Sequence, residues 1–321
     1  MDILKQIKLK AKSKCSTIIL PEANMDERVY KAAKQILREK LAKIIVFGAE
    51  TDFDKTFKTK NCQIIDIKSS AKINEFAMQL YELRKHKGLT LVDAKKLVKT
   101  PIYFAVMMLK NNMADGVVAG AKHASADVLR PALQIIKAKP GKTIVTGSML
   151  MVKHKANSFL FGDVSLCVNP SSEQLSEIAI SNAEFAKTVL GIEPKVAMLS
   201  YSTKGSAKSE FVDKVANAVK IAKQNSKYII DGEMQVDSAL DLDTATRKGL
   251  KEKVKGDANV LIFPDLDAGN IGYKLVSRLG GYIAVGPIML NFDKPINDLS
   301  RGCTVDEIIN TVCFTSLMVE N

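Results

Sequence analysis

Apolar runs and helix-like patterns alternate along almost the whole chain. The apolar runs are short, rich in β-branched residues and bounded by glycine, proline or polar residues; they span 16–22, 42–48, 61–67, 114–120, 142–149, 195–202, 227–234, 258–265 and 281–288. Because these runs are nearly continuous in apolar residues, they predict strands that are buried on both faces, as in parallel sheets.

Between most of these runs, apolar residues recur at the spacing of a helix. Residues 26–40 and 209–225 follow this pattern, and so do residues 170–191, which begin with Pro-Ser and end with Gly. Residues 1–15 alternate apolar and basic positions and predict a short surface helix. The repeated order of strand and helix predicts an α/β fold made of doubly wound domains.

Two breaks in the pattern suggest where the chain crosses between two domains. Residues 138–143 contain a Pro-Gly break, and residues 286–298 hold two prolines and little periodicity. If both are crossings, residues 142–289 form a second domain, and residues 1–141 plus 290–321 form a discontinuous first domain. We therefore expect a cleft between two α/β domains, with a ligand at the carboxyl ends of strands.

The charge of the chain favours anionic ligands but not nucleic acid. The formal net charge is +12, and the lysines are spread along the chain, with 6% aromatic residues and no tryptophan. Arginine is rare, and an arginine offers a planar fork of donors that suits phosphate or carboxylate. The seven arginines are Arg28, Arg38, Arg84, Arg130, Arg247, Arg278 and Arg301.

Several classes of protein are disfavoured by what the sequence lacks. It has no apolar run long enough to cross a membrane, and its start lacks the features of a secretory signal, so we expect a cytoplasmic protein without a membrane partner. The cysteines are odd in number and scattered, which favours reduced thiols. The histidines (His86, His123 and His154) are too dispersed to suggest a metal site. A GxGxxG motif after the first strand and a P-loop are also absent.

Two polar or glycine-containing loops follow strands and suggest ligand contacts. Residues 200–209 are rich in hydroxyl groups, and they form either a ligand loop or a mobile loop that ends in a helix cap at Ser209. Residues 268–274 hold Gly269 and Gly272, which fit either a helix start that holds a phosphate or a tight turn from strand to helix.

Five longer motifs occur in order from about residue 15 to the end of the chain. They are LPEANMDERVYKAA at 20–33, ADVLRPALQIIK at 126–137, SYSTKGS at 200–206, FPDLDAGNIGYK at 263–274 and NDLSRGC at 297–303. Together they resemble the short form of phosphate acetyltransferase, or phosphotransacetylase. The resemblance implies reversible acetyl transfer between coenzyme A and phosphate in acetate metabolism, through a ternary complex and without a cofactor. It also implies two domains like those of isocitrate and isopropylmalate dehydrogenases, and a homodimer.

The resemblance also implies which residues hold the anionic substrates. Arg28, Arg84 and Arg130 match arginines of the family motifs. From the sequence alone, Arg28 lies early in a helix, Arg84 lies near a helix end, and Arg130 precedes Pro131 and is expected to be extended at a helix entrance. The other implied substrate-binding positions are Ser200, Ser202, Ser206, Asn270, Gly272, Tyr273 and Lys274.

The catalytic group implied by the resemblance is centred on Ser300 and Arg301. Ser300 would donate a hydrogen bond at the reacting centre, and Arg301 would bind phosphate and polarise the carbonyl group. The family usually has an aspartate six residues after this arginine, where this chain has Glu307, with Asp306 as a rival base. Residues 304–307 also form a capping-box pattern, which offers a purely structural role for Glu307.

Other interpretations remain open at this point. Cys303 invites a covalent mechanism, but we expect a small buried residue at a helix entrance, because no histidine is near in sequence to activate it. Residues 286–295 lack the Gln-Gly pair that is usual in the family, so the preferred length of the acyl chain stays open. A phosphate butyryltransferase, a dehydrogenase of the same architecture and a non-catalytic protein that binds coenzyme A or anions are the alternatives.

Overall fold

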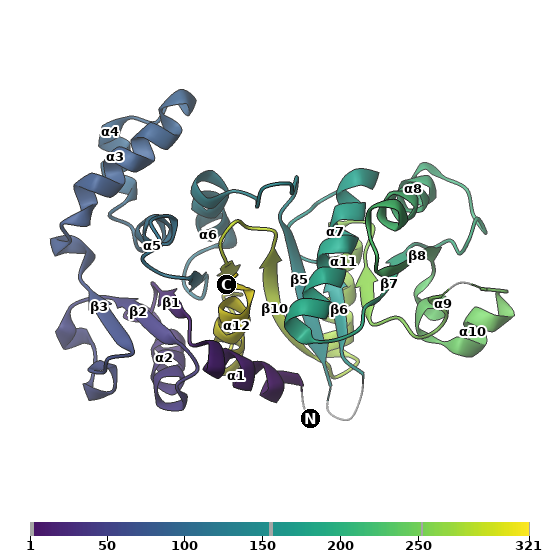
Figure 1. Ribbon diagram of the computed structural model, residues 1–321, viewed down its shortest axis with the longest axis horizontal. Helices are drawn as coiled ribbons and strands as arrows, with labels where there is room; N and C mark the ends of the chain where they lie inside the picture. Colours follow the sequence, from purple (N-terminus) through teal and green to yellow (C-terminus); the bar gives the residue numbers. More distant parts are fainter. Residues whose placement is uncertain (1–2, 154–156, 252, 321) are drawn as a thin grey trace. The chain divides into compact units, whose positions relative to one another are not determined.

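The computed structural model describes residues 3–153, 157–251 and 253–320, and it divides into two compact units. Unit 1 comprises Met1–Lys139 and Phe292–Asn321, and unit 2 comprises Pro140–Asn291. Each unit has its own sheet with helices packed on it (Figure 1). The α/β class predicted from the sequence is therefore confirmed.

Unit 1 is built on a five-stranded parallel sheet of order β11-β4-β1-β2-β3. Its strands are β1 (Thr17–Leu20), β2 (Lys43–Phe47), β3 (Cys62–Ile65), β4 (Gly116–Ala119) and β11 (Ile296–Asp298). The predicted runs match the first four of these. The sequence did not predict β11, because its three residues carry too little pattern.

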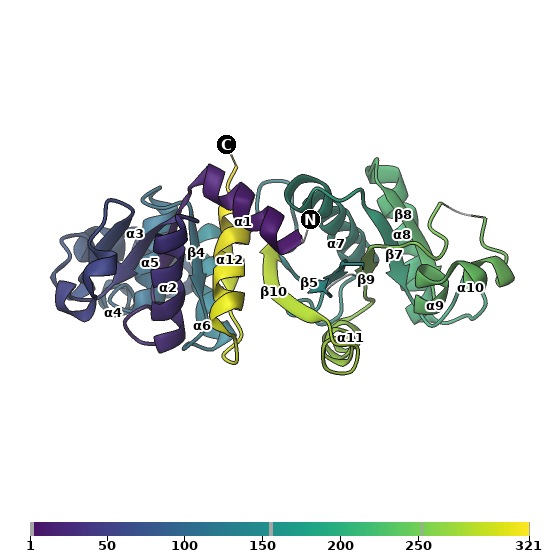
Figure 2. The ribbon, with the colours of Figure 1, turned by 90° about the horizontal axis from the view of Figure 1, so that it is seen from below.

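Helices cover both faces of this sheet, as a doubly wound fold requires. They are α1 (Ile3–Lys14), α2 (Glu27–Glu39), α3 (Lys72–Arg84), α4 (Leu91–Leu97), α5 (Pro101–Lys110), α6 (Ser125–Pro131) and α12 (Val305–Met318). Figure 2 shows α1, α2 and α12 side by side on one face. Short 3₁₀ or π turns lie at Glu50–Asp52, Lys55–Phe57, Ile67–Ser69, Lys85–Lys87 and Ala132–Ile136.

Unit 2 is built on a six-stranded mixed sheet of order β10-β5-β6-β9-β7-β8. Its strands are β5 (Thr146–Val152), β6 (Phe159–Gly162), β7 (Lys195–Leu199), β8 (Ile229–Met234), β9 (Val260–Ile262) and β10 (Ile283–Leu290). β5 pairs antiparallel with both β6 and β10, so the prediction of parallel strands throughout is wrong here. The connection from Val152 to Phe159 is too short for the crossover that a parallel pair needs.

The helices of unit 2 are α7 (Ser172–Phe185), α8 (Glu210–Asn225), α9 (Val236–Leu240), α10 (Leu242–Arg247) and α11 (Leu266–Arg278), with a π turn at Ala186–Leu190. Two of them, α7 and α8, begin at residues that the sequence marks clearly. Ser171 caps α7 in a capping box with Gln174, and Gly191 ends the segment in the left-handed conformation. Ser209 caps α8. These boundaries confirm the predicted helices.

Candidate active site

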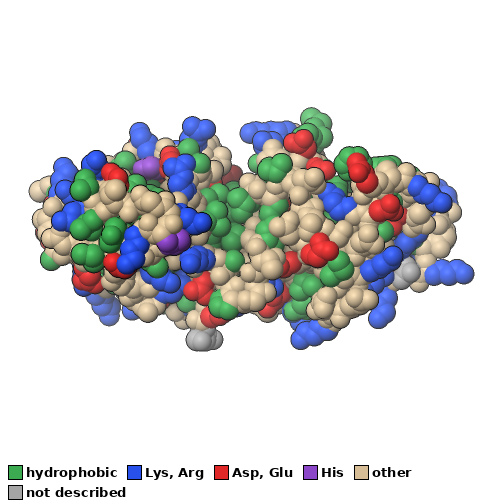
Figure 3. Space-filling model, turned by 90° about the horizontal axis from the view of Figure 1, so that it is seen from above, with side chains coloured by type: hydrophobic (Ala, Val, Ile, Leu, Met, Phe, Trp, Pro, Cys, Tyr) green, Lys and Arg blue, Asp and Glu red, His purple; other side chains and the backbone are tan. Residues whose placement is uncertain are grey.

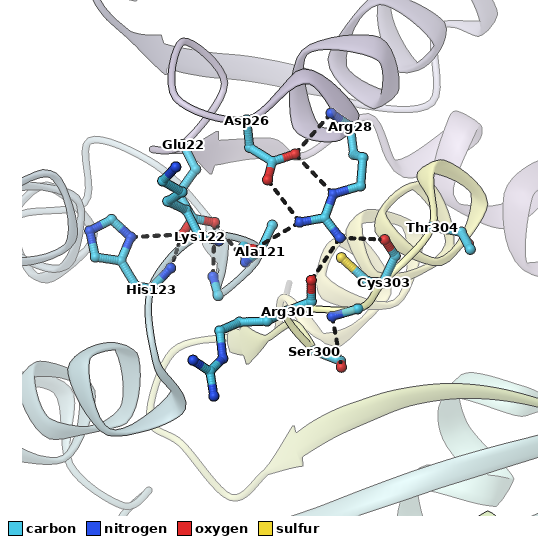
Figure 4. A network of polar contacts seen from close by, with 12 residues as sticks. Glu22, Asp26, Arg28, Ala121, Lys122, His123, Ser300, Arg301, Cys303 and Thr304 are labelled. Atoms are coloured by element: carbon cyan, nitrogen blue, oxygen red, sulfur yellow. Dashed lines mark hydrogen bonds and ion pairs between the residues drawn. The ribbon is translucent and has the colours of Figure 1, made fainter.

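Three loops of unit 1 meet where β1, β4 and β11 end, and they carry the residues that Figure 4 shows. The loop after β1 provides Glu22 and Asp26, and the loop after β4 runs through Ala121. The segment after β11 holds Ser300 and Arg301. Because the three strands are parallel neighbours in the sheet, their carboxyl ends bring these loops together.

Glu22 holds the loop after β4 with a fully buried carboxylate. Its side-chain oxygens accept hydrogen bonds from the backbone N–H groups of Gly120, Ala121, Lys122 and His123, at 2.9 to 3.0 Å. The ring Nδ1 of His123 lies 2.7 Å from Glu22 Oε1. A buried charge needs this many partners, since its desolvation is otherwise costly. The loop after β4 is thereby tied to the loop after β1.

Asp298 is the last residue of β11 and is almost fully buried, at 3% exposed. Burial raises the pKa of its carboxyl to about 6. In the described parts of the chain, its Oδ1 has no hydrogen-bond partner. Gly120 leaves room for it, because a Cβ atom there would lie 2.3 Å from Asp298 Oδ1, and the φ of +113° also favours glycine.

Arg28 lies in the first turn of α2, as predicted, and its guanidinium group bridges the three loops. Nε donates to Asp26 Oδ1 at 3.1 Å, and Nη2 donates to Asp26 Oδ2 and to Ala121 O at 2.8 and 3.0 Å. Nη1 donates to Arg301 O and Cys303 O, both at 2.8 Å. The hydrogen bond from Arg28 lowers the pKa of Asp26, which keeps the pair charged.

Ser300 and Arg301 form an exposed turn that is held by its own backbone. Ser300 Oγ accepts the N–H of Gly302 at 3.2 Å, and Ser300 O accepts the N–H of Cys303 at 2.9 Å. The guanidinium group of Arg301 makes no hydrogen bond to any of the described residues, and it extends away from Arg28 (Figure 4). An exposed fork of five donors suits a phosphate group.

Glu307 lies in the first turn of α12 and takes part in the predicted capping box. Thr304 Oγ1 accepts the N–H of Glu307 at 3.2 Å, and Glu307 Oε2 accepts the N–H of Thr304 at 2.7 Å. Asp306 is exposed, and Glu307 is half-buried. The capping prediction is confirmed. The box uses one carboxylate oxygen of Glu307 and leaves Oε1 outside it.

Cys303 is a buried thiol at the start of the turn into α12, as expected. It is 4% exposed, and burial raises its pKa to about 11, although the charge of Arg28 opposes this rise. A thiol with this pKa is almost wholly protonated near neutral pH, so it is a poor nucleophile.

The charges of Arg84 and Arg130 both affect the pKa of Tyr103 in unit 1. Burial raises the pKa of Tyr103, and the charges of Arg130 and Arg84 both oppose that rise. Arg84 ends α3, as predicted, but the expectation that Arg130 is extended is wrong, since it lies inside α6. Pro131 is the last residue of α6, so the N–H that it lacks is missing only at the end of this helix. Neither arginine side chain donates a hydrogen bond to a residue in the described ranges.

The hydroxyl groups of the loop after β7 bond mainly to backbone N–H groups of the same loop and to side chains at the end of β8 and just after it. Ser200 Oγ accepts the N–H of Ser202, whose own hydroxyl donates to the buried Glu233 at 3.0 Å. Ser206 Oγ accepts the N–H of Thr203 at 2.9 Å. The loop is therefore internally braced, and Ser209 at its end caps α8 as predicted.

The second predicted loop is the body of helix α11. Asp265 caps this helix by accepting the N–H of Ala268 at 2.9 Å, so Gly269 and Gly272 lie inside it. Both predicted locations are therefore wrong, because the glycines lie within the helix and form neither its start nor a turn that leads into it. A Cβ atom on Gly269 would lie 2.2 Å from Asp163 O, and one on Gly272 would lie 3.0 Å from the Phe263 ring, so both serve packing.

The other residues expected on α11 differ in their surroundings. Asn270 Nδ2 donates to Val164 O at 3.0 Å. Tyr273 packs against the core of unit 2, and burial raises its pKa. Lys274 is exposed, with its ammonium 5.8 Å from the centre of the Tyr273 ring. Of these side chains, Lys274 is the one most open to a ligand.

Within the described ranges, the chain carries neither a metal cluster nor a membrane span. No group of three or more His, Cys, Asp or Glu side chains there could hold a metal ion, and His154 lies outside these ranges. None of the helices in the same ranges has the length and apolar character needed to cross a bilayer. Lysine and arginine side chains are spread over the visible face of each unit, among acidic and polar ones (Figure 3).

Sequence reasoning missed four residues of this region: Glu22, Asp298, His123 and Tyr103. A signal was present for the first two, because each carboxylate follows or ends a buried strand where a parallel sheet binds ligands. No signal of this kind marked His123 or Tyr103.

The fold and the site define a doubly wound α/β protein with a braced, arginine-bearing turn suited to an anionic substrate. The chain belongs to the phosphate acetyl/butaryl transferase family, whose family model matches residues 2–316. It is 45% identical to the phosphate acetyltransferase of Clostridium acetobutylicum, over 100% of this chain and 99% of the relative.

Solved structures agree with this assignment. The EutD phosphotransacetylase from Staphylococcus aureus has a TM-score of 0.89 and 41% identity, and the match covers 99% of this chain and 98% of the other. A putative 4-hydroxythreonine-4-phosphate dehydrogenase from Salmonella typhimurium has a TM-score of 0.53 at 10% identity, and the match covers 94% of this chain and 98% of the other. That likeness concerns the fold alone, and it agrees with the expected dehydrogenase-like architecture.

Proposed function

We propose that this protein is a phosphate acetyltransferase, which transfers an acetyl group reversibly between coenzyme A and inorganic phosphate. The observation that carries the proposal is the exposed Ser300–Arg301 turn, whose backbone is held by Arg28 and whose Arg301 guanidinium group makes no hydrogen bond within the described ranges. The family assignment limits the chemistry to transfer of a short acyl group, and relatives of near-equal length carry the acetyltransferase name.

The turn supplies what acyl transfer to phosphate requires. Arg301 holds the phosphate and polarises the thioester carbonyl, and Ser300 donates a hydrogen bond to the developing oxyanion. One such donor typically contributes about 3–4 kcal/mol, and holding the two reactants together contributes about 7–11 kcal/mol. Positioning therefore dominates, and the reaction needs no metal or other cofactor.

Glu307 handles the thiol proton in this mechanism. When acetyl phosphate is consumed, the carboxylate accepts the proton of the coenzyme A thiol, and the sulfur attacks the acetyl carbon. The bond from that carbon to the phosphate oxygen then breaks, and phosphate leaves. In the other direction, a phosphate oxygen attacks the thioester, the carbon–sulfur bond breaks, and protonated Glu307 returns the proton to sulfur. Asp306 is the alternative base.

The remaining substrate contacts come from basic and polar side chains. The charges of Arg84 and Arg130 affect the same tyrosine, Tyr103, and neither guanidinium group donates a hydrogen bond to a described residue. Both side chains are therefore suited to bind the phosphates of coenzyme A. In unit 2, the proposed contacts are Ser200, Ser202, Ser206, Asn270, Gly272, Tyr273 and Lys274. We further propose a homodimer in the cytoplasm, and light scattering on the purified protein would test the dimer.

One assay tests the function directly. Purified protein should release free thiol from acetyl-coenzyme A only when phosphate is present. A higher rate with butyryl-coenzyme A would move the assignment to the butyryl branch. Reduction of a nicotinamide would indicate a dehydrogenase, and binding of coenzyme A without turnover would indicate a non-catalytic binding protein.

A further inference from the structure

Arg28 differs from the other arginines of the site in how its donors are used. A guanidinium group carries five N–H donors. Those of Arg28 bond to two oxygens of Asp26 and to the backbone oxygens of Ala121, Arg301 and Cys303, at 2.8 to 3.1 Å. Every donor has a protein acceptor, so a bound phosphate would have to displace one.

The charge of Arg28 is also balanced within the protein. Its Nη2 lies 2.8 Å from Asp26 Oδ2, and the Asp26 side chain is only 12% exposed. Asp26 further accepts the backbone N–H of Arg28 at 2.9 Å as the cap of α2, which fixes the pair to a rigid helix. An anion therefore meets a neutral pair here, unlike at Arg301.

We infer that Arg28 is a positioning residue that fixes the Ser300–Arg301 turn, and that it is not a ligand of either substrate. It acts by holding the carbonyl groups of Arg301 and Cys303 on one side of the turn, while the Arg301 side chain extends away on the other (Figure 4). The inference depends on the proposed function for its kinetic consequence, but not for its structural one.

Only an arginine can make this brace. The acceptors belong to the loops after three different strands, and a planar fork reaches them from one position. A lysine ammonium has three donors at one point, so it cannot span the same set. Arg28→Lys should therefore keep the positive charge but lose some of the hydrogen bonds that hold the backbone of the Ser300–Arg301 turn.

The kinetic test compares Arg28→Lys with Arg38→Lys, a matched control on the exposed side of the same helix. We expect kcat of Arg28→Lys to fall about 10–100-fold, the size of effect that a small displacement of a reacting group produces. KM for phosphate and for coenzyme A should stay within about twofold, since lost orientation affects the transition state. The control should match the wild type. A tenfold rise in KM for either substrate with unchanged kcat would overturn the inference.

A second measurement separates this inference from the proposed function. The N–H groups of Gly302 and Cys303 both bond to Ser300 in the braced turn. Their hydrogen exchange should be faster in Arg28→Lys than in the wild type and in the control, and equal rates would refute the brace. If the wild type has no acetyltransferase activity, the proposed function fails, and the exchange rates still decide the inference. If Arg28→Lys does not fold, the same measurement is made on Asp26→Asn. Asparagine can also cap a helix, but it carries no charge, so the ion pair with Arg28 is lost.

Discussion

Replacing Glu307 by glutamine should separate its two roles. Glutamine can accept the N–H of Thr304 as Glu307 Oε2 does, so Glu307→Gln keeps the capping box. It removes the basic carboxylate that the proposed mechanism needs for the thiol proton. We therefore expect a folded protein with little activity.

The magnitudes of the two effects differ enough to be measured apart. Loss of a general base typically lowers kcat by ~10²–10⁴-fold, which corresponds to about 3–5 kcal/mol in the barrier. Loss of a helix cap costs about 0.5–2 kcal/mol of unfolding free energy. Thr304→Ala is the matched variant, because it removes the hydroxyl that accepts the N–H of Glu307 and keeps the carboxylate.

The assay pairs initial rates of thiol release with urea unfolding of each variant. Glu307→Gln should lose activity at near-native stability, whereas Thr304→Ala should lose about 1 kcal/mol of stability and keep most of its kcat. Full activity in Glu307→Gln would refute the base assignment. If Asp306→Asn were then inactive, the base would be Asp306. If both were active, the two carboxylates would serve only the helix.

Four further outcomes are expected from the described geometry. Cys303→Ala should keep most of its activity with ternary-complex kinetics, because the buried thiol has a pKa of about 11; a trapped acetyl group on Cys303 would contradict this. Arg84→Lys and Arg130→Lys should each raise KM for coenzyme A or phosphate about 10–100-fold through the lost fork, and unchanged kinetics in both would show that neither binds substrate. Activity should persist in the presence of a chelator. If the chelator abolished activity and one divalent ion restored it, the enzyme would require a metal. Asp298 has a native pKa of about 6 against an ordinary 3.8, so the native state binds this proton more tightly, and stability is lost as pH rises through about 6. As the pH rises from 4.5 to 7, the unfolding free energy of Asp298→Asn, measured with urea, should therefore increase by about 2 kcal/mol relative to that of the wild type. If the unfolding free energies of the two proteins changed equally with pH, the raised pKa of Asp298 would be contradicted.

Much of the local structure could be predicted, because its causes lie within a few residues. Ser171 with Gln174 and Thr304 with Glu307 form capping boxes across three residues, and both mark true helix starts. The five motifs likewise indicated the family, because each is a contiguous run of residues. The catalytic roles of residues within those motifs stay predictions, since each role is defined by a contact with a bound substrate.

The sequence by itself determined the α/β class, most of the strands and helices, and the family. Periodicity, caps and motifs record these directly, because each depends on neighbouring residues. Only the tertiary structure decided the antiparallel pairing of β5 with β10 and the partners of Arg28, whose Nη1 bonds to the carbonyl of a residue 273 positions away. Such contacts depend on which strands lie side by side in the sheet, and local patterns do not encode that order.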